Sequence, residues 1–207
     1  MNEGYEEVLR AIASSDPTPG GGSVAALSLA HAQSLAVMVA RLTVGKEKWA
    51  DGHKMADSII SKWGSKIDFA IGLAEKDSDA FDRVMEAYRL PRSDEMENEL
   101  RKSSIREATM GAAQAPFETA TEALDLLSDI EPFIHSCNSN ALTDLASAAE
   151  LSGSAVKIAS MNVRINLDFI EGEDVDVLSK SLDVVVGESS TKLESIRSNV
   201  SERLGWK

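Results

Sequence analysis

The chain has 207 residues, 43% of them hydrophobic, and a formal net charge of −13. This composition supports a hydrophobic core, and the negative charge makes phosphate backbones and anionic membrane surfaces poor partners, so we expect neither nucleic acid nor membrane binding. The single cysteine, Cys137, excludes an internal disulfide framework and a four-thiolate metal site, and it favours a cytoplasmic location. The length fits one domain over residues 1–207.

The first expected helix covers residues 2–14. Val8, Leu9 and Ile12 lie on one face of it, and its early glutamates do not resemble the basic start of an export signal. Residues 16–22 are rich in proline and glycine and should end the helix, because neither residue suits a helix interior.

Residues 24–40 form the most apolar stretch, which Ser23 should open as a helix. The stretch is apolar nearly all round and contains His31 and Gln33. A membrane span needs about 20 apolar residues. The pattern therefore predicts a central, buried helix of a bundle.

The remaining chain shows further helical periodicity and almost no strand-like alternation. Pro91 should end one helix, a cap near Ser93 should start the next, and Pro116 should kink that helix. The other expected helices cover residues 49–90, 141–170 with a possible break near Asn162, and 178–200. These patterns predict an all-α bundle of long, largely antiparallel helices. A 30-residue helix spans about 45 Å, more than a small core needs, so we also predict a homodimer.

The first candidate site is the loop that leads into the apolar helix. Its glycines allow close backbone approach, and the helix start offers free N–H groups to an anionic or carbonyl ligand. No lysine follows the last glycine, so the loop is not a phosphate-binding P-loop. The alternative is a flexible turn with a serine cap. The candidate residues are Pro19, Gly20, Gly21, Gly22 and Ser23.

Two further segments contain charged candidates. Thr43 and Lys46 follow the apolar helix, where Lys46 could hold a carboxylate or move a proton, or could simply satisfy terminal carbonyls after a stop at Gly45. Asp77 lies three and four residues from apolar Ala74 and Phe81, so it can sit beside the buried face and act in proton transfer. The alternative for Asp77 is a solvated charge cluster.

A last group consists of polar residues around the fifth helix. Asn140 and Asp144 suit either a helix start or a ligand site, whereas Asn162 and Asn166 share one helix face and could pair with each other or hold a ligand. The three histidines have no metal-binding spacing, so we expect no metal.

The order of these segments resembles the cyclodeaminase/cyclohydrolase family of folate enzymes over about residues 5–200. The run from Pro17 to Ser23, PTPGGGS, carries the strongest resemblance. Weaker matches are LTVGK at 42–46, Asp77 with Ala80 and Phe81, AYRLP at 87–91, Thr143 with Asp144, and NVRIN at 162–166. The sequence departs from the family where Cys137 precedes Asn138 in place of a Gly-Asn pair.

The resemblance implies an all-α homodimer that acts on a one-carbon unit carried by tetrahydrofolate, the reduced folate being its substrate and carrier. It implies either formiminotetrahydrofolate cyclodeaminase or methenyltetrahydrofolate cyclohydrolase activity, without separating them. Asp77 or Asp144 would then stabilise the cationic carbon and move protons, and Lys46 and the glycine loop would hold the pterin carbonyl or the glutamate carboxylate. The alternative is a non-catalytic helical scaffold or folate-binding module.

Overall fold

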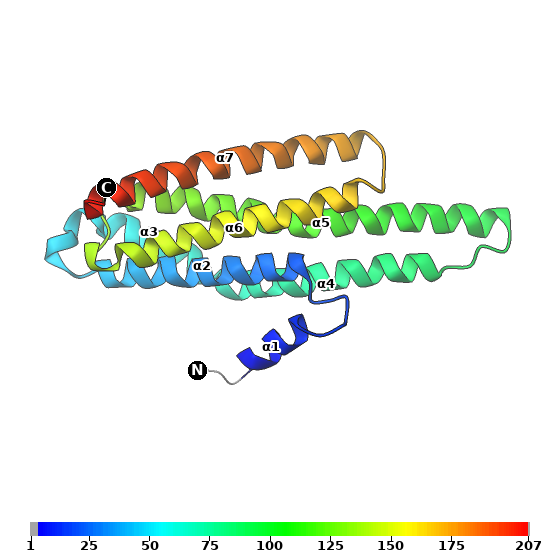
Figure 1. Ribbon diagram of the computed structural model, residues 1–207, viewed down its shortest axis with the longest axis horizontal. Coiled ribbons are helices and arrows are strands. Elements are labelled where there is room, and N and C mark those ends of the chain that lie inside the picture. Colours follow the sequence, from blue (N-terminus) through cyan, green and yellow to red (C-terminus); the bar gives the residue numbers. More distant parts are fainter. Residues whose placement is uncertain (1–3, 207) are drawn as a thin grey trace.

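A computed structural model describes residues 4–206 and shows only helices in that range (Figure 1). The all-α prediction is confirmed. The elements are α1 Tyr5–Ile12, α2 Gly21–Thr43, η1 Glu47–Gly52, α3 His53–Trp63, α4 Ile67–Arg89, α5 Glu95–Phe133, η2 Ser139–Ala141, α6 Leu142–Leu167 and α7 Glu173–Leu204.

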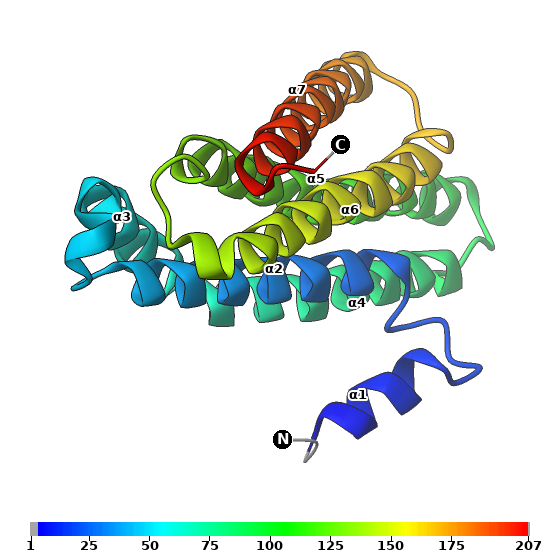
Figure 2. The same cartoon turned by 60° about the vertical axis from the view of Figure 1, so that its left-hand side comes forward.

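Helix α2 is the centre of the bundle. It packs against α3, α4, α5 and α6, while α7 covers α5 and α6 (Figure 2). Alanines at Ala25, Ala26, Ala32 and Ala36 are fully buried, and their small side chains let neighbouring helices approach closely. The expected central helix is therefore confirmed, three residues longer at each end than its apolar stretch.

By length and composition alone α2 could also cross a membrane. Its most apolar 18-residue window has a mean hydropathy of 1.5, and 61% of that window is buried inside the bundle. The core helix of a folded protein meets the same criteria. The burial agrees with the core position predicted from the sequence.

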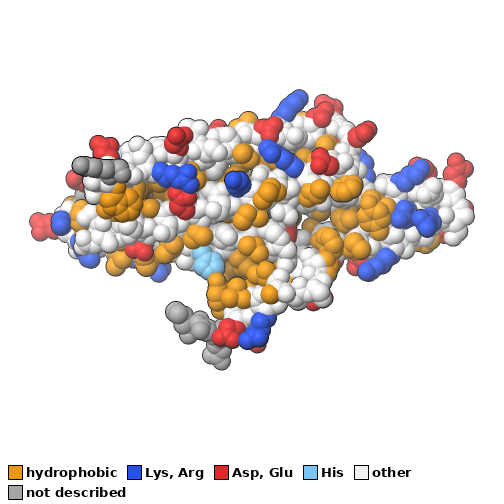
Figure 3. All heavy atoms as spheres, viewed as in Figure 1, with side chains coloured by type: hydrophobic (Ala, Val, Ile, Leu, Met, Phe, Trp, Pro, Cys, Tyr) orange, Lys and Arg blue, Asp and Glu red, His pale blue; other side chains and the backbone are white. Residues whose placement is uncertain are grey.

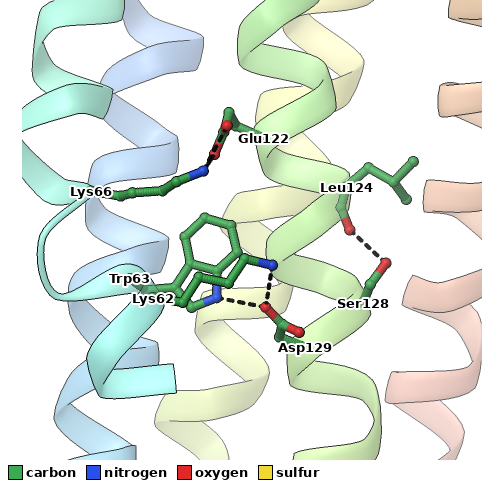
Figure 4. A network of polar contacts seen from close by, with 7 residues as sticks. All are labelled: Lys62, Trp63, Lys66, Glu122, Leu124, Ser128 and Asp129. Atoms are coloured by element: carbon green, nitrogen blue, oxygen red, sulfur yellow. Dashed lines mark hydrogen bonds and ion pairs between the residues drawn. The ribbon is translucent and has the colours of Figure 1, made fainter. Parts of the chain in front are cut away.

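The expected continuous helix over residues 49–90 is wrong. The segment divides into η1, α3 and α4, with a turn at residues 64–66 between the last two. The reason is tertiary: Trp63 is fully buried at the end of α3, and its indole N–H donates to Asp129 Oδ2 at 2.8 Å. Lys62 donates to the same oxygen. Lys66, at the start of α4, donates to Glu122 of α5 (Figure 4). These bonds to α5 hold the chain through the turn.

Several boundaries also differ from the expectation. Asp94, rather than Ser93, caps α5, and its carboxylate accepts from the backbone N–H of Glu97 at 2.8 Å. Helix α5 continues through Pro116, whose ring is buried, and α6 continues through Asn162 without a break. Part of the expected helix at 2–14 lies outside the described residues, and α1 itself has no buried residue.

Candidate functional site

The glycine loop brings the first turn of α2 against the middle of α4. Gly20 is the N-cap residue of α2 and has no side chain to cap it, so the N–H groups of Gly21 and Gly22 have no cap, whereas the backbone of Ser23 bonds to the Asp77 carboxylate. Ser23 Oγ donates to Asp77 Oδ2 at 3.1 Å. A methyl group added at Gly22 would overlap with the Asp77 carboxylate, so only glycine permits this approach.

The surroundings of Asp77 alter its acidity. Burial raises the pKa of Asp77 above its ordinary value, and this effect outweighs the hydrogen bonds from the Ser23 side chain and backbone, which lower the pKa. Desolvation penalises the carboxylate more than the neutral acid. Asp77 is therefore suited to carry a proton at a pH where an exposed aspartate has lost it.

An amide from α6, that of Asn162, stands beside the same helix start, and Asn166 lies one helical turn further along. A methyl group at Gly21 would lie 3.2 Å from Nδ2 of Asn162. The Nδ2 group of Asn162 donates to the carbonyl of Ile158 at 2.9 Å, and that of Asn166 donates to the carbonyl of Ala112 at 3.0 Å. The amide donors are used inside the protein, and the Oδ1 atoms make no hydrogen bond within residues 4–206, so they are available as acceptors.

The other end of α2 is built differently. Asn138 Nδ2 donates to the carbonyl of Leu42 at 2.9 Å, and the backbone N–H of Asn138 donates to Thr43 Oγ1 at 3.0 Å. Thr43 in turn donates to the carbonyl of Val39. These bonds satisfy terminal groups of α2. The Thr43 hydroxyl is thus occupied by two protein groups.

Three other predicted residues lie at this second end. Lys46 is exposed, and its backbone carbonyl accepts from the N–H of Trp49 at 2.8 Å and from Nε2 of His53 at 3.0 Å. Gly45 has a φ of 75°, so the turn that places Lys46 requires a glycine-like conformation. Asn140 is exposed, and Asp144 lies half-buried in the first turn of α6.

The structure therefore divides the predicted residues into two groups. The N-terminal group comprises Pro19, Gly20, Gly21, Gly22, Ser23, Asp77, Asn162 and Asn166. The C-terminal group comprises Thr43, Lys46, Asn140 and Asp144. Twenty residues of α2 separate Ser23 from Thr43, a distance of about 30 Å. Within one chain, the two groups cannot contact the same carbon atom.

One polar residue of the N-terminal group was not singled out from the sequence. Ser78 Oγ lies 3.2 Å from Ser23 Oγ and extends the cluster around Asp77. In the sequence, only its position directly after Asp77 indicated that Ser78 belongs to the site. Among residues 4–206, no three His, Cys, Asp or Glu side chains are grouped so as to hold a metal ion. The arrangement can hold a carbonyl or N–H edge beside a proton-carrying carboxyl group.

Comparison with known proteins gives consistent matches. A family model described as Formiminotransferase-cyclodeaminase matches residues 4–181. Methenyltetrahydrofolate cyclohydrolase of Methylorubrum extorquens is 29% identical over 204 residues, 98% of each chain. Formimidoyltransferase-cyclodeaminase of Gallus gallus is 30% identical over 165 residues, which cover 80% of this chain and 30% of that one. The crystal structure of a formiminotetrahydrofolate cyclodeaminase from Thermotoga maritima aligns with a TM-score of 0.80 at 28% identity, covering 97% and 94% of the chains.

Proposed function

Because the chain belongs to the formiminotransferase-cyclodeaminase family, we propose that it is an enzyme of folate one-carbon metabolism that acts at the 5,10-methenyl bridge of tetrahydrofolate. The observation that carries this proposal is Asp77, a carboxyl group of raised pKa that accepts hydrogen bonds from Ser23 in the first turn of α2. The full-length cyclohydrolase relative favours hydrolysis, and the cyclodeaminase structure favours ammonia release.

Both reactions pass through a tetrahedral carbon between N5 and N10. In the hydrolysis, water adds to the cationic methenyl carbon and one of its protons is released. The remaining hydroxyl proton is removed as the carbonyl forms, and N5 takes up a proton as its bond to the carbon breaks, which gives 10-formyltetrahydrofolate. In the deamination, N10 attacks the formimino carbon, its proton passes to the imino nitrogen, and one further proton lets ammonia leave as the methenyl cation forms. A single acid/base group near this carbon can carry out the proton transfers of either reaction.

Asp77 is the group we assign to these proton transfers. As a carboxylate it stabilises the cationic carbon and takes a proton, and as a neutral acid it supplies one. Ser23 and Ser78 orient it, and Gly22 leaves room for it. The Oδ1 atoms of Asn162 and Asn166 accept from N–H donors at the pterin edge, while the free N–H groups of α2 bind its carbonyl.

Two assays of the purified protein test this proposal. One follows the loss of methenyltetrahydrofolate absorbance above the spontaneous rate, and the other measures ammonia released from 5-formiminotetrahydrofolate. We expect turnover in at least one assay, and the assay with the larger kcat/KM identifies the reaction. Absence of turnover in both would contradict the proposal and leave the scaffold or folate-binding alternative.

We also propose that the chain works as a homodimer in the cytoplasm. The support for a dimer is an exposed apolar surface on a protein of high negative charge, including Leu9, Met38, Ile71 and Met161. Figure 3 shows apolar side chains gathered over α1 and the adjoining part of α2. Light scattering at micromolar concentration should give twice the mass of the chain, and a monomer would contradict the proposal.

A further inference from the structure

Helices α4 and α5 extend beyond the start of α2 as a two-helix arm (Figure 1). The arm comprises residues 81–106, which form the last turns of α4, the connection to α5 and the first turns of α5. In the bundle α2 packs along one side of α4, but α2 begins only at Gly21 (Figure 2). The same side of α4 therefore has no cover from α2 in the arm, immediately beyond Asp77.

This side of the arm presents aromatic side chains in one row. Asp77 and Ser78 both contact Ser23, so they mark the side of α4 that faces α2. Phe81 follows Asp77 by four residues and Tyr88 follows Phe81 by seven, so the helical repeat places both rings on that side. Phe81 is 36% exposed and Tyr88 is 47% exposed. Figure 3 shows apolar side chains gathered over the base of the arm. Such a row beside a polar cluster is suited to a ligand with a flat ring next to its reacting group.

An arginine lies at the outer end of this row. The Arg101 guanidinium is over the Tyr88 ring, 5.5 Å from the ring centre. Nε and Nη2 of Arg101 donate to the Tyr88 carbonyl at 3.3 and 3.1 Å, which fixes the guanidinium. Its Nη1 group makes no hydrogen bond within residues 4–206, so the edge formed by Nη1 and Nη2 can bind a carboxylate through two N–H groups.

The acidic residues at the start of α5 do not neutralise Arg101. The carboxylates of Asp94 and Glu97 accept backbone N–H groups, and Glu99 pairs with Lys102. Arg101 makes no ion pair in the described part of the chain. An aromatic row that ends in an unpaired guanidinium is complementary to a flat ring that carries a carboxylate.

The order of these groups along α4 matches the order of groups in a reduced folate. In the folate, N10 joins the one-carbon unit to a benzoyl ring, and the ring carries a glutamate with its carboxylates. Along α4, Phe81 lies about 6 Å and Tyr88 about 16 Å beyond Asp77. Lys46, at the opposite end of α2, is about 30 Å away. Within one chain, Arg101 rather than Lys46 is the cation that an extended folate reaches from Asp77.

We propose that the arm binds the p-aminobenzoylglutamate part of the substrate: Phe81 packs against the benzoyl ring, and Arg101 binds a carboxylate of the glutamate. This inference rests on the proposed function, because it takes a reduced folate as the ligand. It adds the residues that select a folate over the shorter pteroate, which lacks the glutamate. The guanidinium contact should contribute about 10-fold to kcat/KM and the ring contact about 3- to 10-fold.

Two substrates that differ only in the glutamate, a tetrahydrofolate and the corresponding tetrahydropteroate, test the role of Arg101. In the assay that gives turnover, the wild type should prefer the folate by about 10-fold in kcat/KM. Arg101→Ala should lose this preference by lowering kcat/KM for the folate alone, and Arg101→Lys should keep part of it. Lys180→Ala removes one positive charge from exposed α7 and is the matched control, which should keep the full preference.

A purely structural role of Arg101 gives a different result. If the guanidinium only holds the Tyr88 carbonyl, Arg101→Ala should affect the folate and the pteroate equally. Equal losses with both substrates, or a wild type without preference between them, would overturn the proposal.

A second variant tests the aromatic row. Phe81→Ala should raise KM by about 3- to 10-fold for the folate and the pteroate alike, with little change in kcat, because the benzoyl ring is common to both. Val184→Ala, an apolar residue that is 58% exposed on α7, is the matched control and should keep the wild-type KM. Circular dichroism and light scattering check the fold and the mass. An unchanged KM would overturn the proposal, as would a changed mass, which would assign Phe81 to a contact between chains.

Binding measurements separate this inference from the proposed function. Calorimetry with 5-formyltetrahydrofolate requires no turnover, and its affinity for Arg101→Ala should be about 10-fold weaker than for the wild type. That result supports the arm as a folate site even where the wild type turns over neither substrate, an outcome that contradicts the proposed function alone. Wild-type turnover together with equal affinities of the two proteins would overturn the arm site and leave the proposed function standing.

Discussion

The two ends of α2 use similar residue types for different purposes. At the C-terminal end, Asn138 and Thr43 satisfy one another and the last carbonyls of the helix, so their polar groups are consumed by the fold. At the N-terminal end, the helix has no side-chain cap of its own, and Asp77 is partly desolvated beside it. Polar groups that stabilise the fold are paired with the protein, whereas those available for chemistry are incompletely paired and energetically costly.

The largest effect should come from removing the carboxyl group at the N-terminal end. Asp77→Asn keeps the size of the side chain but cannot exchange a proton, so kcat should fall by about 10²- to 10⁴-fold. Turnover with methenyl- and formiminotetrahydrofolate is the measurement. Asp79→Asn, on exposed surface two residues away, is the control and should retain activity. An Asp77→Asn protein with wild-type kcat would remove Asp77 from the mechanism.

The next effect tests the close approach of α2 to Asp77. Gly22→Ala forces the carboxylate aside, so we expect about 100-fold lower kcat/KM from misplacement and a loss of about 1–3 kcal/mol in the free energy of unfolding. Gly72→Ala is the matched control, because a methyl group at this exposed position of α4 meets no atom. That control should be as stable as the wild type or slightly more stable. Equal activity of the two variants would show that the position of Asp77 is not critical.

A substitution at the C-terminal end of α2 should lower the stability of the protein more than its activity. Asn138 is 3% exposed, and Asn138→Ala removes both the donor to the Leu42 carbonyl and the acceptor of the Asn140 N–H, so it should cost about 1–3 kcal/mol of stability. Its kcat should stay within about threefold of wild type at a temperature where the protein is folded. Urea unfolding and steady-state kinetics measure both quantities, with the exposed Ser147→Ala as control. A kcat loss larger than the stability loss would place Asn138 in the site.

The smallest effect concerns the cost of burying Asp77. Between the ordinary aspartate pKa of 3.8 and the raised pKa in the folded state, the unfolded chain has lost the proton that the folded chain still holds. Stability must therefore fall as pH rises through this interval. Asp77→Asn removes this penalty, so its stability relative to wild type should improve from pH 4 to pH 7, by about 1–3 °C in Tm. A relative stability that decreases over this range would mean that the ionised carboxylate stabilises the fold.

Sequence periodicity identified most of the helices because burial on one face imposes a 3.6-residue repeat. It failed at residues 64–66, where Gly64 is the only local signal of a turn and a single glycine is also tolerated inside a helix. The bonds of Trp63 and Lys66 to α5 end α3 and start α4 there, and such contacts join residues more than 50 positions apart. The possible break near Asn162 is wrong, because α6 is continuous from Leu142 to Leu167. The kink at Pro116, which lies inside α5, stays a prediction.

The sequence by itself determined the all-helical class, the central apolar helix and the residue types of the site, because hydrophobic period and glycine chemistry are local properties. Only the tertiary structure decided which of these residues meet. Asp77 reaches Ser23 because Gly22 lets two helices approach, while Lys46 and Asp144 are carried to the far end of α2. Twenty residues of a helix span about 30 Å. A sequence motif does not show at which end of α2 a residue will lie.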